Sequence, residues 1–140
     1  MNIPDTEVRK AFIALISGLN IPVFDEVVPK NIDIPPTRVL LSTQTDSQVS
    51  TNKCGHLWNH TLLIDIVSEC PQGFSNKSVV DGIYNSINNL VDLASGDISL
   101  NGFVVYNTQL QNSHDMYWNG PSISTNRKLV RYQFVIGASQ

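Results

Sequence analysis

Two alternating runs near the end of the chain predict a long antiparallel hairpin. In residues 127–136, apolar side chains occupy every second position: Val130, Tyr132, Phe134 and Ile136. This is the period of a half-buried strand. Residues 103–111 alternate in the same way and form its predicted partner. The 15 residues between the runs, 112–126, exceed the usual hairpin connection of about 2–5 residues, so we expect a long loop there.

Two further segments have helical spacing. Residues 7–19 repeat apolar side chains at Val8, Phe12, Leu15, Ile16 and Leu19. Asp5 and Thr6 offer N-caps for this helix. A second stripe comprises Val79, Val80, Ile83, Ile87, Leu90 and Val91. We expect this second helix to be capped by Ser75 and ended by Gly96.

The middle of the chain contains the clearest strand, residues 57–68. One of its faces is predicted to enter the core with Trp58, His60, Leu62, Ile64 and Ile66. Shorter extended segments are expected at 23–28 and 39–45. Between 39–45 and the long strand lies a polar stretch, 46–55, whose Ser, Thr, Gln and Asn content is typical of a loop.

These elements predict one α+β domain covering residues 1–140. A chain of this length buries roughly two-thirds of the surface that its unfolded form exposes, so a substantial core is possible. Because most strands follow one another through short connections, we expect an antiparallel or mixed sheet. Both helices should pack on one face of this sheet, and the long hairpin should close the chain.

Charge and cysteine content narrow the classes of partner. Only 15% of residues are charged and the net charge is −3, which gives no general attraction to nucleic acid or to an anionic membrane. Apolar runs are too short to span a bilayer, so we expect a soluble protein. Cys54 and Cys70 are expected to be reduced thiols, with a disulfide between them as the minor alternative.

The sequence contains no convergent catalytic or metal-binding motif. His56 and His60 would share a face of a strand at a separation of about 13 Å, which is too far to bind one ion. Cys54 could in principle pair with His56 or His114, but no cysteine-enzyme signature surrounds it. We therefore expect no catalytic residue, no metal ion and no cofactor.

Candidate contact residues gather in the predicted loop and directly after it. Met116, Tyr117 and Trp118 could fold back over one end of the core, or they could contact another molecule. Arg127, Lys128 and Arg131 are the basic cluster, and they could meet nucleic acid or, as we prefer, an acidic neighbouring subunit. The partner-binding hypothesis covers seven residues: His114, Asp115, Met116, Tyr117, Trp118, Arg127 and Lys128.

The order of segments resembles a known family. An opening amphipathic helix leads through residues 23–28 into a strand preceded by Pro35 and Pro36. A histidine-bearing strand ending in Ser68, a helix, a strand at 103–110 and a basic-aromatic closing strand at 127–136 then follow. This pattern resembles the tail-completion or tail-terminator proteins of tailed bacteriophages, over residues 7–137.

The resemblance implies a sheet with two helices on one face, a ring usually of six subunits, and no catalysis or cofactor. It implies a virion location in the tail or neck after assembly in the host cytoplasm, with tail-tube proteins and head-connector or portal-side proteins as partners. A twelve-fold ring of the same junction is the alternative stoichiometry. The alternative function is a small binding or regulatory domain that recognises a protein or small ligand through residues 112–126.

Overall fold

The computed structural model describes residues 3–25, 33–52, 55–93 and 98–138. Helix α1 (Asp5–Ile16) runs into a short 3-10 helix, η1 (Ser17–Leu19), and helix α2 (Lys77–Leu93) lies near the middle of the chain. The strands are β1 (Val23–Asp25), β2 (Thr37–Asn52), β3 (Gly55–Pro71), β4 (Ser99–Leu100), β5 (Phe103–Asn119) and β6 (Ile123–Ala138).

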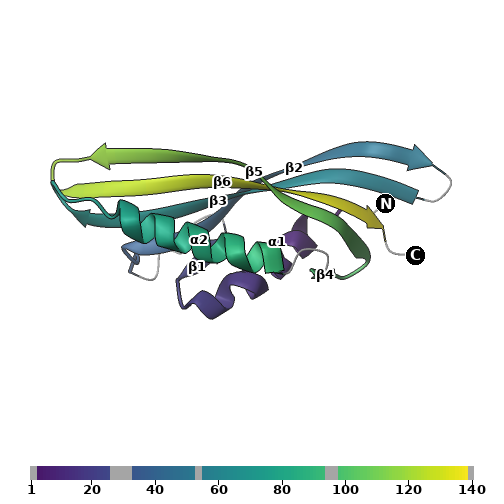
Figure 1. Cartoon of the computed structure of the whole chain (residues 1–140), viewed down its shortest axis with the longest axis horizontal. Coiled ribbons are helices and arrows are strands. Elements are labelled where there is room, and N and C mark those ends of the chain that lie inside the picture. Colours follow the sequence, from purple (N-terminus) through teal and green to yellow (C-terminus); the bar gives the residue numbers. More distant parts are fainter. Residues whose placement is uncertain (1–2, 26–32, 53–54, 94–97, 139–140) are drawn as a thin grey trace.

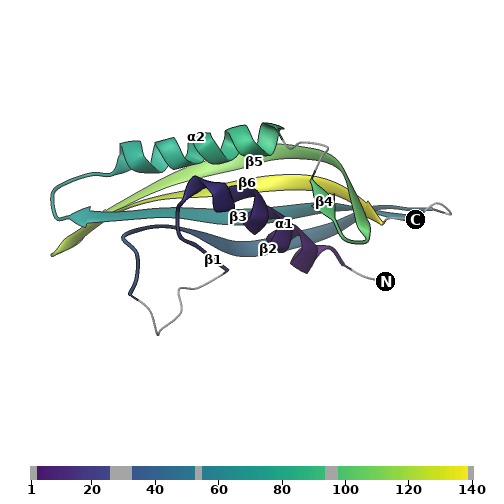
Figure 2. The ribbon, with the colours of Figure 1, turned by 90° about the horizontal axis from the view of Figure 1, so that it is seen from below.

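One mixed sheet of six strands organises the molecule, in the order β1-β2-β3-β6-β5-β4. The β1–β2 pair is parallel and every other pair is antiparallel. Both helices lie on the same face (Figures 1 and 2), and we call the opposite side of the sheet the bare face. The predicted α+β class is therefore confirmed, as are the helices on one face and the closing hairpin.

The core lies between the helices and the central strands, and the period-two positions supply its sheet side. The predicted face of β3 is buried from Trp58 to Ile66, and so are the alternating residues of β6 from Val130 to Ile136. Helix α1 adds Val8, Phe12 and Ile16, while α2 adds Val80, Ile83, Ile87 and Val91. Val79 is the exception among the predicted helical positions, because its side chain is exposed.

Both predicted polar loops are wrong. Residues 112–119 continue β5, residues 123–126 begin β6, and only 120–122 connect the two strands. Likewise, residues 46–52 continue β2. Asn and Ser have low strand propensity, but propensity depends strongly on context. Here each polar stretch pairs residue by residue with an inner strand, β6 or β3, and that ladder determines its conformation.

The outer strands carry bulges that the inner pair lacks. The register of β5 against β6 shifts between Val105 and Asn107 and again between Leu110 and Asn112. The register of β2 against β3 also shifts twice. By contrast, β3 and β6 pair continuously from Leu57↔Gly137 to Pro71↔Ile123. The extra residues therefore sit on the outside of a regular central pair.

The helix caps differ from the prediction. Pro4, rather than Asp5 or Thr6, precedes α1, and no side chain caps it. Ser75 lies two residues before α2, and its Oγ accepts a hydrogen bond from the Lys77 N–H. The predicted stop at Gly96 and the extension of β1 over residues 26–28 lie outside the described residues. Neither described helix is long and apolar enough to cross a membrane.

Candidate functional site

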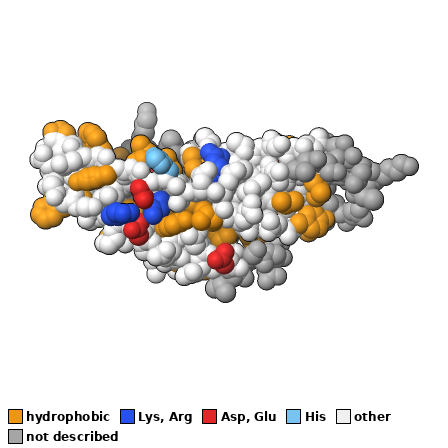
Figure 3. Space-filling view, turned by 45° about the horizontal axis from the view of Figure 1, so that its top comes forward, with side chains coloured by type: hydrophobic (Ala, Val, Ile, Leu, Met, Phe, Trp, Pro, Cys, Tyr) orange, Lys and Arg blue, Asp and Glu red, His pale blue; other side chains and the backbone are white. Residues whose placement is uncertain are grey.

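The end of the β5–β6 hairpin exposes an unusual number of large apolar side chains. We define the tip surface as Met116, Tyr117, Trp118 and Ile123, together with Phe74 from the β3–α2 connection. All five are more than two-fifths exposed, and Trp118 reaches 62%. Hydrophobic side chains gather at this end of the molecule in Figure 3. Since exposed apolar clusters in soluble proteins often mark contact sites, the tip surface is the leading interaction candidate.

The residues of the tip surface on β5 lie on both faces of the sheet, beside the outer edge of this strand. Met116 pairs with Arg127 and Trp118 with Thr125 on the bare face, whereas Tyr117 pairs with Asn126 on the helix side. The Tyr117 hydroxyl donates to the Phe74 carbonyl at 3.2 Å. An open groove of about 380 Å³ is lined by Met116, Tyr117, Trp118, Thr125 and Arg127. In the alternative prediction, Met116, Tyr117 and Trp118 cap one end of the core. The structure does not match this alternative, because the three side chains lie outside the core.

Lys128 and Asp115, two of the predicted contact residues, have partners within the chain. The Lys128 ammonium lies 2.8 Å from Asp81 Oδ1 on α2 and 3.3 Å from Asp115 Oδ1 on β5. It also lies 4.6 Å from the centre of the Tyr84 ring. Burial opposes its charge, but the hydrogen bonds to Asp81 and Asp115 outweigh burial and raise the pKa of Lys128. This network joins α2 to the hairpin.

The rest of the predicted basic cluster lies on the bare face. Arg127 forms a bidentate ion pair with Asp65, a carboxylate that is 4% exposed. Hydrogen bonding to Asp65 raises the pKa of Arg127. Arg131 donates to the Thr61 hydroxyl at 2.9 Å. An acidic partner for the cluster thus exists within the chain itself. The seven predicted residues are neighbours in space, with His114 exposed on β5 beside them.

A second polar cluster, which the sequence did not reveal, lies near the other end of the core. His60 is completely buried, and its Nδ1 lies 2.6 Å from Asp46 Oδ1 on β2 and 3.7 Å from Asp5 Oδ1 on α1. Asp5 and Asp46 are 41 positions apart, so no local motif could have paired them. The only signal was a histidine at a core position of a strand.

Hydrogen-bond directions in this cluster favour a proton over a metal ion. Gln44 is oriented because its Oε1 accepts from Arg9 and its Nε2 donates to the Asp5 carbonyl. The same Nε2 lies 2.9 Å from His60 Nε2, which must therefore be the acceptor. The imidazole proton then resides on Nδ1 and faces Asp46. A metal ion bound among these groups would need a lone pair on His60 Nδ1, but that nitrogen carries the proton.

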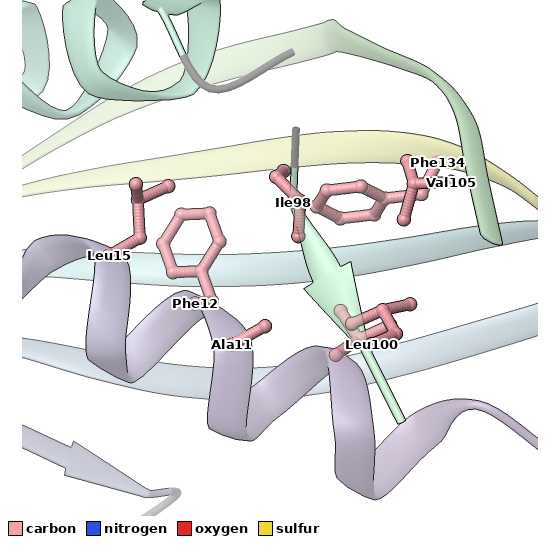
Figure 4. A pocket seen from close by; sticks show the side chains of 8 residues that line it. Ala11, Phe12, Leu15, Ile98, Leu100, Val105 and Phe134 are labelled. Carbon is pink, nitrogen blue, oxygen red and sulfur yellow. The ribbon is translucent and has the colours of Figure 1, made fainter. Parts of the chain in front are cut away.

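An apolar pocket between α1 and the sheet offers no polar chemistry. Its walls include Ala11, Phe12 and Leu15 from α1, with Val105 and Phe134 from the sheet (Figure 4). The space is about 10 Å³, at the lower limit for one water molecule. We interpret it as imperfect packing in the core.

The thiol predictions can be followed only in part. Cys70 is a free thiol whose Sγ lies 3.8 Å from the Ser124 carbonyl oxygen. Cys54 lies outside the described residues, as does the side chain of His56. The minor alternative of a disulfide between Cys54 and Cys70 does not fit the free Cys70 thiol, whereas the pairing of Cys54 with a histidine stays a prediction.

Comparison with known proteins identifies a fold relative. No family model matches the chain, and no curated protein matches it. Among solved structures, a chain in the virion of a native gene transfer agent particle superposes with a TM-score of 0.67 at 16% sequence identity. The match covers 94% of this chain and 93% of that chain. The protein thus shares its fold, over almost its whole length, with a chain of that virion.

Proposed function

We propose that the protein is a structural, non-catalytic component of a tailed-phage virion, which forms a ring at the head–tail junction. In this role it completes or terminates the tail and joins it to the head connector. The observation that carries the proposal is a pair of sheet edges, one along β2 and one along β5, that no described strand covers. The fold shared with a virion chain supports the structural role.

The two open edges are left by two short covering strands. β1 pairs with β2 only at Val39, Leu40 and Leu41, so no described strand faces the outer edge of residues 42–52. β4 pairs only with Phe103 and Val104, which leaves residues 105–119 of β5 similarly open within the described chain. The β2–β3 and β5–β6 hairpins project in opposite directions along the long axis (Figure 1). Such edges readily pair with another chain unless they are protected.

Pairing one edge with the other edge of an identical neighbour is a heterologous contact, which closes into a ring when the rotation permits. Asn112 lies at the middle of the open β5 edge. Within one subunit, Asn112 pairs with Arg131 of β6, Arg131 pairs with Leu63 of β3, and Leu63 lies opposite residues 42–43 of β2. The middle of the open β2 edge is residue 47. If the two midpoints pair, residue 47 of one subunit lies where residues 42–43 would lie without a displacement. Each neighbour is then displaced along the strands by four to five residues, or about 15 Å.

This displacement is consistent with a closed barrel. β2, β3, β6 and β5 together span about 19 Å at about 4.8 Å per strand. A displacement of about 15 Å over that width tilts the strands by about 40° from the ring axis, within the range of about 35–45° that barrels adopt. A six-fold ring, with a twelve-fold ring as the alternative, is the proposed assembly. The tip surface would then contact the next component along the axis.

Cysteine cross-linking tests the ring and its displacement together. The native cysteines are first removed by Cys54→Ser and Cys70→Ser. Asn112→Cys and Ser47→Cys are then introduced, because the displaced pairing brings Asn112 of one subunit next to Ser47 of its neighbour on the bare face. Oxidation should give a ladder of bands that ends at the ring size. The matched control pairs Ser47→Cys with Asn107→Cys, which lies level with Ser47 across the sheet and should not cross-link.

Assembly should be examined with native mass spectrometry and electron microscopy, both alone and with tail-tube and connector proteins. The ring proposal predicts closed particles and a loss of particle attachment in the tip variants Met116→Ala and Trp118→Ala. A chain that stays strictly monomeric under all these conditions would contradict it.

A second candidate function follows from the groove at the tip. Its aromatic lining and Arg127 suit a peptide or a small anionic ligand. Trp118 is exposed whereas Trp58 is buried, so a ligand there should change the emission of Trp118 alone. Saturable quenching that Trp118→Phe abolishes, without any change in particle mass, would favour this binding-domain function over the ring.

A further inference from the structure

Asp5, Asp46 and His60 form a cluster in which His60 is buried, Asp5 is half-buried and Asp46 is exposed. The three side chains come from α1, β2 and β3, and their candidate ligand atoms lie within 4.8 Å of one another. His60 donates its one proton, on Nδ1, to Asp46. Asp5 Oδ1 is buried and accepts no hydrogen bond from any described group. The two adjacent carboxylates thus have one donor between them, and a further proton would satisfy the buried Oδ1 of Asp5.

His60 cannot readily supply that proton. A second ring proton would reside on Nε2, directly against the Gln44 amide nitrogen, which already donates there. Rotating the Gln44 amide would break its bonds to Arg9 and to the Asp5 carbonyl. The polar network therefore favours a neutral imidazole, and the additional proton must come to the carboxylates.

The surrounding charges do not compensate two carboxylates fully. The charge of Arg9 on α1 acts on Asp5, but its guanidinium also lies 3.4 Å from Asp25 of β1 and donates to Gln44 of β2. The groups around the pair are thus Arg9 from α1, Asp25 from β1, Gln44 from β2 and His60 from β3. The single guanidinium is divided between the carboxyls of Asp5 and Asp25.

We propose that Asp5 and Asp46 share one proton, which fastens the first turn of α1 to β2 and β3 in mildly acidic solution and loosens that turn when it leaves near neutral pH. The fastened part is the N-terminal turn of α1, which no side chain caps. Its attachment to the sheet near residue 46 therefore depends on this cluster more than on helix capping.

The direction of the effect follows from the carboxyl of Asp5. Burial, together with the hydrogen bond and charge of Asp46, raises the pKa of Asp5 from 3.8 to about 6, although Arg9 opposes the change. A folded-state pKa above the unfolded value means that the stabilisation is complete below pH 3.8 and is lost as the pH rises through 6. The equilibrium constant for opening the turn should rise about tenfold between pH 5 and pH 7, and hardly further above pH 7.

Amide hydrogen exchange of the peptide covering residues 3–16 measures this opening. After correction for the intrinsic pH dependence of exchange, protection in the wild type should fall about tenfold from pH 5 to pH 7. Asp5→Asn supplies a permanent donor to Asp46 in place of the shared proton. This variant should keep the protection of the wild type at pH 5 throughout the range.

Glu7→Gln is the matched control, because Glu7 lies in the same helical turn and, among the described residues, forms an ion pair only with Lys10, at 3.7 Å. It should retain the pH dependence of the wild type. Wild-type protection that is constant from pH 5 to pH 7, or an Asp5→Asn profile with the wild-type slope, overturns the proposal. A loss of protection on acidification overturns it as well. Circular dichroism of each variant establishes that the fold is intact.

Discussion

Replacing Lys128 by Met separates an internal role of this residue from a partner-binding role. Met keeps most of the aliphatic stem but removes the ammonium that joins Asp81 of α2 to Asp115 of β5. The Lys128 side chain is 9% exposed, so water replaces little of what the ammonium loses. We expect the variant to fold with reduced stability.

The size of the loss follows from the contacts. A hydrogen bond to a charged group contributes about 1.5–3 kcal/mol, and the cation–π contact with Tyr84 adds about 0.5–1 kcal/mol. Opposing this, Asp81 and Asp115 are partly exposed and can rehydrate, and Lys77 stays within 3.3–3.4 Å of both. A net loss of about 2 kcal/mol is therefore expected, which lowers the melting temperature of a domain of this size by about 8 °C.

Thermal and urea unfolding, followed by circular dichroism, measure this loss. Lys10→Met is the control: the Lys10 side chain is 71% exposed and, within the part of the chain that the structure describes, forms an ion pair only with Glu7, so the substitution should cost no more than about 0.5 kcal/mol. A Lys128→Met variant that melts like the wild type but fails to assemble would refute the reasoning. Lys128 would then act on a neighbouring subunit rather than within its own.

Three further substitutions test the packing. Leu62→Ala empties a completely buried position of β3 and should cost about 2–5 kcal/mol in urea unfolding; a cost below about 1 kcal/mol would mean that the centre of the core is elsewhere. Gly120→Ala places a Cβ 2.8 Å from the Ile123 carbonyl oxygen, so it should distort the hairpin turn and lower the melting temperature, which an unchanged melting curve would contradict. Tyr132→Phe removes the hydroxyl that donates to Asn88 Oδ1 and should cost about 1–2 kcal/mol, with the far-ultraviolet circular dichroism unchanged.

The fold was predictable where one face of an element is buried. Alternation across β3 and β6 identified the central strands because their helix-facing side chains, such as Ile64 and Phe134, must be apolar. The distal halves of β2 and β5 carry little apolar alternation, and the helices meet them through polar contacts such as Gln44 with the Asp5 carbonyl and Asp115 with Lys77. Their strand conformation comes from pairing with an inner neighbour, which is a non-local property that composition conceals.

The candidate site was predictable in its residues but not in their roles. The apolar character of Met116 and Trp118 within a polar stretch made them contact candidates in the sequence, with burial over the core as the alternative, and only the structure shows that they are exposed. The internal partners of Lys128 and Arg127 were not predictable, because Asp81 and Asp65 lie 47 and 62 positions away. The cluster at His60 was missed for the same reason, since its carboxylates come from separate elements.

The paired bulges of β5 control which side chains point to which side of the sheet. One extra residue inverts the alternation of a strand, and a second restores it. Deleting Gln111 alone would remove the second bulge and leave Asn112 opposite Arg131, so Met116 and Trp118 would stay on the bare face and Tyr117 on the helix side. A change of one residue at a bulge can thus alter the length of the strand without turning the contact surface over, whereas the same change in a regularly paired stretch inverts every side chain beyond it.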